Sequence, residues 1–127
     1  YTKLYTDNLN NVLLKARMTL KFEILDCGLA YCKNTYQDVL ETGLSPYALA
    51  RSIVNNMAGI KEINVWATFT ELEDGRIIIE LRSSGKNVNQ IAVKYGGGGH
   101  IQASGATISG YEELELVIED LIALAKE

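Results

Sequence analysis

The chain has 127 residues, 47% of them apolar, and a formal net charge of −4. This length and composition fit one globular domain and are not typical of a disordered protein. The acidic balance excludes a global basic field able to hold long nucleic acid, so an anionic ligand has to be held by a few local donors. The sequence shows neither a signal segment nor an apolar run of membrane-spanning length, and we therefore expect a cytoplasmic protein without a membrane partner.

The first 20 residues carry apolar side chains at helical spacing, which predicts a helix with Thr6 or Asp7 as its N-cap. Its predicted apolar positions are Leu9, Val12, Leu13, Ala16 and Leu20. We assign residues 1–20 to this helix, which either packs on the domain or connects it to an upstream domain, and residues 21–127 to the domain itself. Residues 21–25 and 29–33 are strand-like and flank a turn at residues 26–28.

The two cysteines, Cys27 and Cys32, lie in and beside this predicted hairpin. Two cysteines are too few for a disulfide framework in a chain of this size. With a single histidine and no second cysteine pair they also make a poor zinc site. We interpret both as ordinary structural residues.

The middle of the chain predicts a helix and a hairpin. Ser45 and Pro46 begin a helix that Gly59 would cap, with its apolar face at Leu49, Ile53, Val54 and Met57. Residues 63–69 and 77–81 alternate as strands around the three-residue loop at residues 73–75. This loop length places the odd-numbered apolar residues of both strands on one face, and Trp66 about opposite Arg82 on the other. Trp66 suits a role in the core, or alternatively stacking against a base.

The last third predicts two helices and a strand. Asn87 and Gln90 form a capping box that begins one helix, which has to stop at the glycines that follow. Residues 103–108 are extended, and Ser109 with Glu112 forms a second capping box. The final helix has a continuous apolar stripe of Leu114, Val117, Ile118, Leu121 and Ala125. Together these elements predict a single α+β domain, a mixed sheet of about five short strands covered by amphipathic helices.

Residues 96–100 read Gly-Gly-Gly-Gly-His, a costly sequence because glycine loses more backbone entropy on folding than any other residue. Gly96 is explained as a helix C-cap. The others suit either a flexible linker or a loop whose N–H groups face phosphate oxygens, and we favour the phosphate loop. A lone histidine often has only a structural role. At the edge of this loop, however, His100 can donate to a phosphate or contact the active site of a neighbouring domain. Ser104 adds a hydroxyl.

Arg82 is the second candidate element, because it ends a strand and is followed by two serines. A surface arginine is usually only solvated, yet its guanidinium fork suits phosphate. The candidate substrate-binding residues are therefore Arg82, Ser83, Ser84, Gly96, Gly97, Gly98, Gly99, His100 and Ser104.

Residues 94–105, together with 65–67 and 82–84, resemble the DHH-associated C-terminal domain. The resemblance covers essentially the whole chain, and is strongest to the version in bacterial oligoribonucleases that also dephosphorylate 3′-phosphoadenosine 5′-phosphate. It implies that the glycines and His100 contact the substrate phosphate and that Arg82 with nearby serines grips the nucleotide. In that family a separate N-terminal domain carries an Asp-His-His motif and binds two divalent metals, usually manganese. This chain contains no such motif, so we expect no catalytic residue, no metal and no cofactor here, and no activity of the chain alone.

The resemblance implies short RNA or a nucleotide as substrate and the parent's own DHH domain as partner, and it leaves homodimer formation and substrate preference open. The chain departs from the family at Ile101, where relatives frequently carry a basic residue. This leaves the phosphate loop with less fixed charge. A related domain ends alanyl-tRNA synthetases, so an RNA- or tRNA-binding module is the alternative function. A third is an interaction domain in which the glycines form a hinge.

Overall fold

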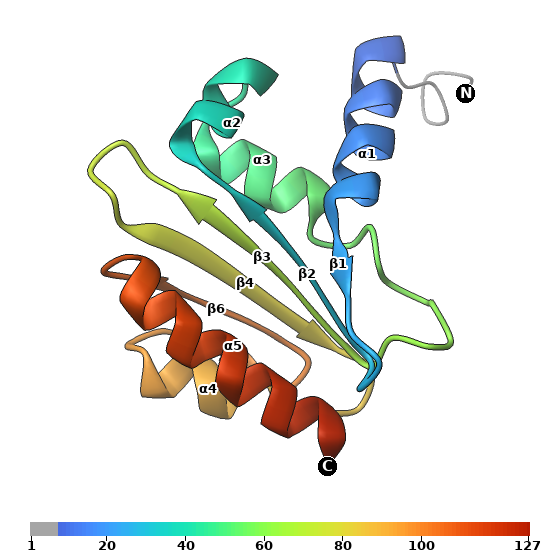
Figure 1. The fold of residues 1–127 in the computed structure, drawn as a ribbon, viewed down its shortest axis with the longest axis vertical. Coiled ribbons are helices and arrows are strands. Elements are labelled where there is room, and N and C mark those ends of the chain that lie inside the picture. The colour runs from blue at the N-terminus through green and yellow to red at the C-terminus, as the bar shows by residue number, and fades with distance from the viewer. Residues whose placement is uncertain (1–7) are drawn as a thin grey trace.

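The computed structural model describes residues 8–127 and shows one six-stranded sheet with helices on both faces (Figure 1). In spatial order the strands are β1 (Glu23–Ile24), β2 (Leu29–Asn34), β3 (Val65–Glu71), β4 (Ile77–Ser83), β6 (Ala103–Ile108) and β5 (Gly98–His100). Strands β2 and β3 are parallel, and the other neighbours are antiparallel. The predicted α+β class is confirmed. The sheet has one strand more than expected because part of the glycine run forms β5.

In the described part of the chain, five helices cover this sheet in two layers (Figure 1). One face carries α1 (Leu9–Lys21), α2 (Tyr36–Thr42) and α3 (Pro46–Ile53), and the other carries α4 (Asn89–Lys94) and α5 (Tyr111–Lys126). The larger core lies under α4 and α5 and contains the odd-numbered apolar side chains of β3 and β4. The predicted apolar stripe of α5 is confirmed, since all five of its residues are buried in this core.

The predicted register of the β3–β4 hairpin is also confirmed. Trp66 pairs with Arg82, and the backbone N–H of Leu72 donates to the carbonyl oxygen of Arg76 at 2.7 Å, which closes a three-residue loop. Gly75 has a φ of 92°, a backbone conformation that residues with a Cβ rarely adopt. The hairpin therefore places every even-numbered side chain of β4 on the face opposite α4 and α5.

The first helix, α1, buries a different face from the one predicted from the sequence. The N-cap is Asn8, whose side chain accepts from the N–H of Asn11, whereas Thr6 and Asp7 lie outside the described residues. The side chains that pack inward are Leu14 and Met18. The predicted apolar positions Leu9, Val12, Leu13 and Leu20 are instead exposed large hydrophobic residues. The helix also extends through Lys21, so the strand predicted over 21–25 shrinks to the two residues of β1.

Other helix boundaries differ because local capping decides them. α2 was not predicted, although Thr35 and Asp38 form a complete capping box at its start. α3 begins as predicted, with Ser45 as N-cap and Pro46 in its first turn, but it ends at Ile53 and the chain continues in turns to Gly59. The residues predicted for its apolar face are nevertheless buried.

Two further caps differ in detail. α4 begins at Asn89, and only half of its predicted capping box is present, with Asn87 Oδ1 accepting from the N–H of Gln90 at 3.3 Å. At α5 the N–H of Ser109 donates to Glu113, one residue beyond the predicted Glu112. Within residues 8–127, no helix combines the length and hydropathy needed to cross a membrane.

The two thiols lie in different environments and should react differently. Cys32 is fully buried on β2, and this burial raises the pKa of its thiol, while Cys27 is partly exposed in the turn before β2. A raised pKa lowers the thiolate fraction, and the thiolate is the nucleophile. We expect a disulfide reagent at pH 8 to modify one thiol of the native chain quickly, and both after denaturation. Equal fast labelling of both native thiols would contradict the placement of Cys32.

Candidate functional site

Arg82 and His100 lie on the same face of the sheet. Arg82 on β4 pairs with Ala103 on β6, and Ala103 pairs in turn with His100 on β5. Directly paired residues of antiparallel strands point to the same side of a sheet. The sheet thus brings together two candidates that are 18 positions apart in the sequence.

A surface almost without side chains separates these two residues. Glu80 pairs with Gly105, and Gly105 pairs with Gly98, which forms a second row beside the first. We call Gly98, Ala103 and Gly105 the glycine floor. Two strand spacings from β4 to β5 and two residues along a strand give the rectangle with Glu80, Arg82, His100 and Gly98 at its corners sides of about 10 and 7 Å. A Cβ on Gly98 would have no heavy atom within 4 Å, so the floor is open above this residue.

The helix layer leaves the glycine floor accessible. α1, α2 and α3 pack over β2 and β3, with α3 reaching β4. Beyond this layer the three floor residues are only partly buried, and the His100 side chain is exposed. The face is therefore a shallow, open wall at the edge of the sheet.

Arg82 is held in place while part of its guanidinium stays free. Its Nη1 donates to the carbonyl oxygen of Leu81 at 2.9 Å and of Ser104 at 3.4 Å, and lies 3.3 Å from Glu80 Oε2. Within residues 8–127, Nε and Nη2 have no hydrogen-bond partner. The arginine is thus oriented on one side and able to donate on the other.

His100 is positioned by its backbone. The β5–β6 turn is tied down by two hydrogen bonds, from the N–H of Ser83 to the carbonyl of Gln102 at 3.0 Å and from the N–H of Val88 to the carbonyl of Ile101 at 2.8 Å. Ile101, which stands where the resembling family often has a basic residue, is 58% exposed in this turn. The anchored turn fixes where His100 leaves the sheet, and its ring projects from there with no partner among the described side chains.

The glycine run forms a helix cap and an edge strand, where the sequence suggested an open phosphate loop. Gly96 has a φ of 88° and, as predicted, caps the C-terminus of α4. Its N–H donates to the carbonyl oxygen of Val93, and the N–H of Gly97 donates to the carbonyl oxygen of Ala92, which is a Schellman motif. These two N–H groups are therefore not free for a ligand. A Cβ on Gly97 would lie 2.0 Å from the carbonyl oxygen of Gly105, and one on Gly99 would lie 2.6 Å from that of Ala103. Close backbone approach explains both of these glycines.

Ser83 and Ser104, two of the three serines proposed from the sequence, do not lie on this face. Ser104 is 3% exposed on the α4 side of the sheet, where its hydroxyl donates to the carbonyl of His100 at 2.5 Å. Ser83 is 5% exposed and its hydroxyl donates to the carbonyl of Lys86. Ser84 follows the end of β4 and is exposed. Ser83 and Ser104 thus support the local backbone.

Trp66 and Glu80 lie on the same side of the sheet as Arg82. Trp66, which pairs with Arg82, is 6% exposed in the core under α1–α3, so the core role considered for it is correct. Its indole Nε1 is buried without a hydrogen-bond partner among residues 8–127. Glu80 was missed by sequence reasoning, because an acidic residue on a strand is usually only a solvated side chain. The signal that could have found it is its position two residues before Arg82, which places both on one face.

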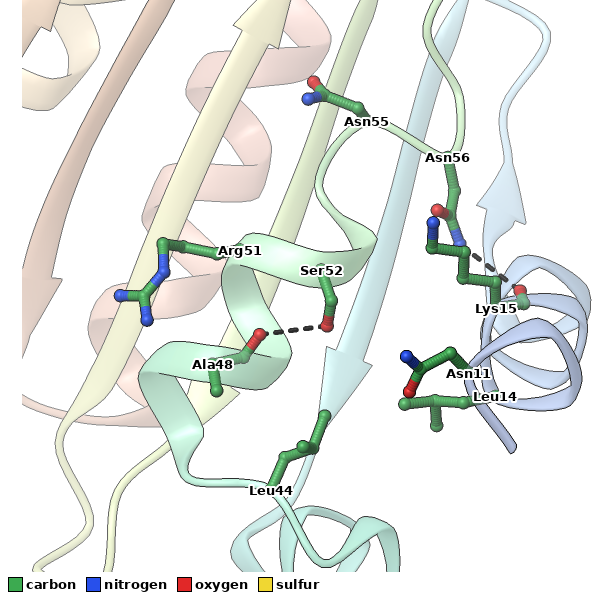
Figure 2. Close-up of a pocket in the computed structure, with 9 residues that line it drawn as sticks. All are labelled: Asn11, Leu14, Lys15, Leu44, Ala48, Arg51, Ser52, Asn55 and Asn56. Carbon is green, nitrogen blue, oxygen red and sulfur yellow. Dashed lines mark hydrogen bonds between the residues drawn. The ribbon is translucent and has the colours of Figure 1, made fainter. Parts of the chain in front are cut away.

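A deeper hollow lies elsewhere, between α1 and α3 (Figure 2). This groove has a volume of about 600 Å³ and is lined by polar side chains such as Lys15, Ser52 and Asn55. Asn56 spans it and donates to the carbonyl oxygen of Lys15 at 3.3 Å, whereas Arg51 extends away from α1. None of the residues proposed from the sequence lines this groove. The glycine floor is the better candidate because Arg82 and His100 lie on the same face beside it, although it is less concave.

The described residues offer no fit to a pair of divalent metals. Within residues 8–127, no three side chains of His, Cys, Asp or Glu lie close enough to hold a metal ion. The described residues therefore provide no site for a metal-dependent step. The arrangement of Arg82 and His100 is suited to binding an anion and has no activated nucleophile beside it.

The chain is similar to proteins of one known family. The DHHA1 domain family matches residues 36–127. A curated relative, the "Bifunctional oligoribonuclease and PAP phosphatase NrnA" of Bacillus subtilis, is 34% identical over 129 aligned positions that cover 100% of this chain and 40% of that protein. The chain spans less than half the length of the curated relatives it matches.

Two solved structures are similar in fold. An exopolyphosphatase-related protein from Bacteroides fragilis superposes with a TM-score of 0.80 and 26% identity, over 97% of this chain and 38% of that one. The C-Ala domain of alanyl-tRNA synthetase from Aquifex aeolicus superposes with a TM-score of 0.60 and 15% identity, over 84% of this chain and 99% of that one. At this low identity the second likeness concerns the fold alone.

Two neighbouring glycines should respond oppositely to the same substitution. Gly97→Ala places a Cβ against the backbone of β6, so we expect a loss of about 1–3 kcal/mol or more in the free energy of unfolding. Gly98→Ala enters open space at a φ that alanine adopts, so we expect a change within about 0.5 kcal/mol. Urea unfolding of both variants measures this difference. Equal stability of the two variants would rule out the close approach of β5 to β6.

Proposed function

Because this chain belongs to the DHHA1 domain family, we propose that it is the substrate-binding domain of a DHH phosphoesterase acting on short RNA or 3′-phosphoadenosine 5′-phosphate. The observation that carries this proposal is the shared face of Arg82 and His100 across the glycine floor. The names of the curated relatives supply the substrate classes, which are oligoribonucleotides and the bisphosphate nucleotide.

The substrate phosphate would lie between the two donors. Arg82 presents Nε and Nη2, a planar pair that matches two phosphate oxygens, and its other contacts hold it in this orientation. His100 approaches from the far side of the floor with a ring nitrogen able to donate. Since Gly98 and Gly105 carry no side chains, the sugar–phosphate backbone can rest directly on the sheet.

This domain would orient the substrate, and the hydrolytic step would take place in the DHH domain of a longer parent protein. There, the two divalent metals of the family, with manganese expected, would activate a water and stabilise the leaving oxygen. The contribution of Arg82 and His100 is to hold the reacting phosphate in place, which lowers the entropic part of the barrier. A shallow wall suits this division of labour, because the second domain would close over it.

A tRNA-binding module is supported less well by these observations. The face from β4 to β5 measures about 10 by 7 Å, the size of one or two nucleotides rather than of a tRNA arm. The net charge of −4 also provides no extended field for a folded RNA. Tighter binding of folded tRNA than of a dinucleotide would reverse this preference.

Replacing the two donors should weaken binding without unfolding the chain. Loss of a charged hydrogen-bond donor costs about 1.5–3 kcal/mol, so we expect Arg82→Ala to raise the Kd for 5′-phosphorylated diadenylate by about ten- to a hundredfold. His100→Ala should raise it severalfold. Arg76→Ala removes an exposed arginine of the β3–β4 loop and serves as the matched control, with no expected change. Calorimetric titration gives the three values, and wild-type affinity of both site variants would refute the assignment of this face.

Catalysis should be absent from the chain alone. We expect no hydrolysis of diadenylate or 3′-phosphoadenosine 5′-phosphate, with or without added manganese, because the described residues bring no metal-binding cluster together. Product formation followed by chromatography measures this directly. Manganese-dependent turnover by the purified chain would contradict the proposed division between binding and catalysis.

A further inference from the structure

Glu80 is an acidic residue at a position where the proposed ligand is an anion. It lies on the same face as Arg82 and His100, in the row formed with Gly105 and Gly98. Its Oε2 would lie 3.3 Å from a Cβ on Gly105, so the carboxylate extends over the glycine floor. A carboxylate here repels a phosphate, so any contact it makes with the ligand is with another group.

The contacts of Glu80 leave one acceptor available. Oε2 lies 3.3 Å from Arg82 Nη1, and Oε1 has no partner within residues 8–127. The side chain is 25% exposed, so solvent and ligand can reach it. An ionised carboxylate only accepts hydrogen bonds, and its match on a ligand is therefore a hydroxyl or an amino group.

We propose that Glu80 accepts a hydrogen bond from the ribose 2′-hydroxyl of the bound nucleotide, and so makes this domain select RNA over DNA. This inference rests on the proposed function, because it needs a nucleotide phosphate between Arg82 and His100. Along β4 the Cα atoms of Glu80 and Arg82 are about 7 Å apart, but their side chains meet through Oε2 and Nη1. A phosphate on the guanidinium and a sugar hydroxyl of the same nucleotide on the carboxylate would therefore be bound side by side. The 2′-hydroxyl is the group that tells RNA from DNA, and a carboxylate is a well-established acceptor for it.

The geometry also explains why both glycines of that row are needed. A Cβ on Gly105 would meet the carbonyl oxygen of Ile79 at 2.9 Å and crowd the Glu80 carboxylate. A side chain on Gly98 would occupy the space above the floor that a ribose needs. The bare row therefore gives the sugar access to the carboxylate, while the row of Arg82 and His100 holds the phosphate.

The test compares the affinity of the chain for 5′-phosphorylated diadenylate and for its 2′-deoxy counterpart. For the wild type we expect the ribonucleotide to bind about tenfold or more tightly, since the deoxy ligand leaves the carboxylate unpaired. In Glu80→Ala this ratio should fall to about one, through a weaker ribonucleotide complex. Glu80→Gln, which keeps an acceptor oxygen and the contact with Arg82, should retain part of the preference. Glu73→Ala, an equal charge change in the β3–β4 loop, is the control and should keep the wild-type ratio.

Each result has a distinct meaning. If Glu80 only positions Arg82, both affinities fall by the same factor in Glu80→Ala and the ratio is unchanged, which overturns the inference. Equal wild-type affinity for the two ligands overturns it as well, yet leaves the proposed function standing. Absence of binding to either ligand overturns the proposed function itself. Thermal unfolding of each variant verifies that the ratios come from folded protein.

Discussion

The alternation of side chains along β4 is the constraint on which the rest of the structure depends. Ile79 and Leu81 are fully buried against α4 and α5, and burying each such side chain stabilises the fold by about 1.5–3 kcal/mol. A slip of one residue would expose both, so the core fixes the register of β4 against β3 and β6. The ion pair between Glu80 and Arg82 is partly exposed, and such pairs contribute about 1 kcal/mol or less. It is therefore too weak to fix the register of β4. The apolar core thus orients the charged face.

The glycines serve two purposes that their sequence does not distinguish. Gly97, just before β5, and Gly99 within it allow the backbone to approach β6 more closely than any side chain would permit. Gly98 meets no such restriction, and its missing side chain keeps the face open in the row beside Arg82 and His100. One run therefore joins the edge strand to the sheet and clears a surface for a ligand. This is a narrower role than a loop of inward-pointing N–H groups, because the cap of α4 uses two of those groups.

Strong periodicity made much of the fold predictable from the sequence. The β3–β4 hairpin and α5 each bury one regular face, so their patterns indicated both type and register. The buried face of α1 was predicted wrongly because this helix has apolar residues on two sides, and only packing decides that Leu14 and Met18 face inward. β5 could not be found by pattern, since glycines carry no side chains to alternate.

The site was predictable in its residues and not in its arrangement. Arg82 and His100 stood out by their chemistry, but their shared face depends on the pairing of β6 with both β4 and β5. The same pairing sends Ser104 to the opposite side, which the sequence alone does not indicate. Glu80 was not predicted as a site residue because its proposed role depends on its position over the row of Gly105 and Gly98.

Mapping amide chemical shifts during titration with 5′-phosphorylated diadenylate tests the central claim most directly. If the glycine floor binds the ligand, the largest shifts fall on Gly98, His100 and residues 103–105, accompanied by the Arg82 side chain. The groove between α1 and α3 should stay unperturbed at Asn55 and Asn56 (Figure 2). Shifts concentrated in that groove, or no shift at the floor at saturating ligand, would contradict the account.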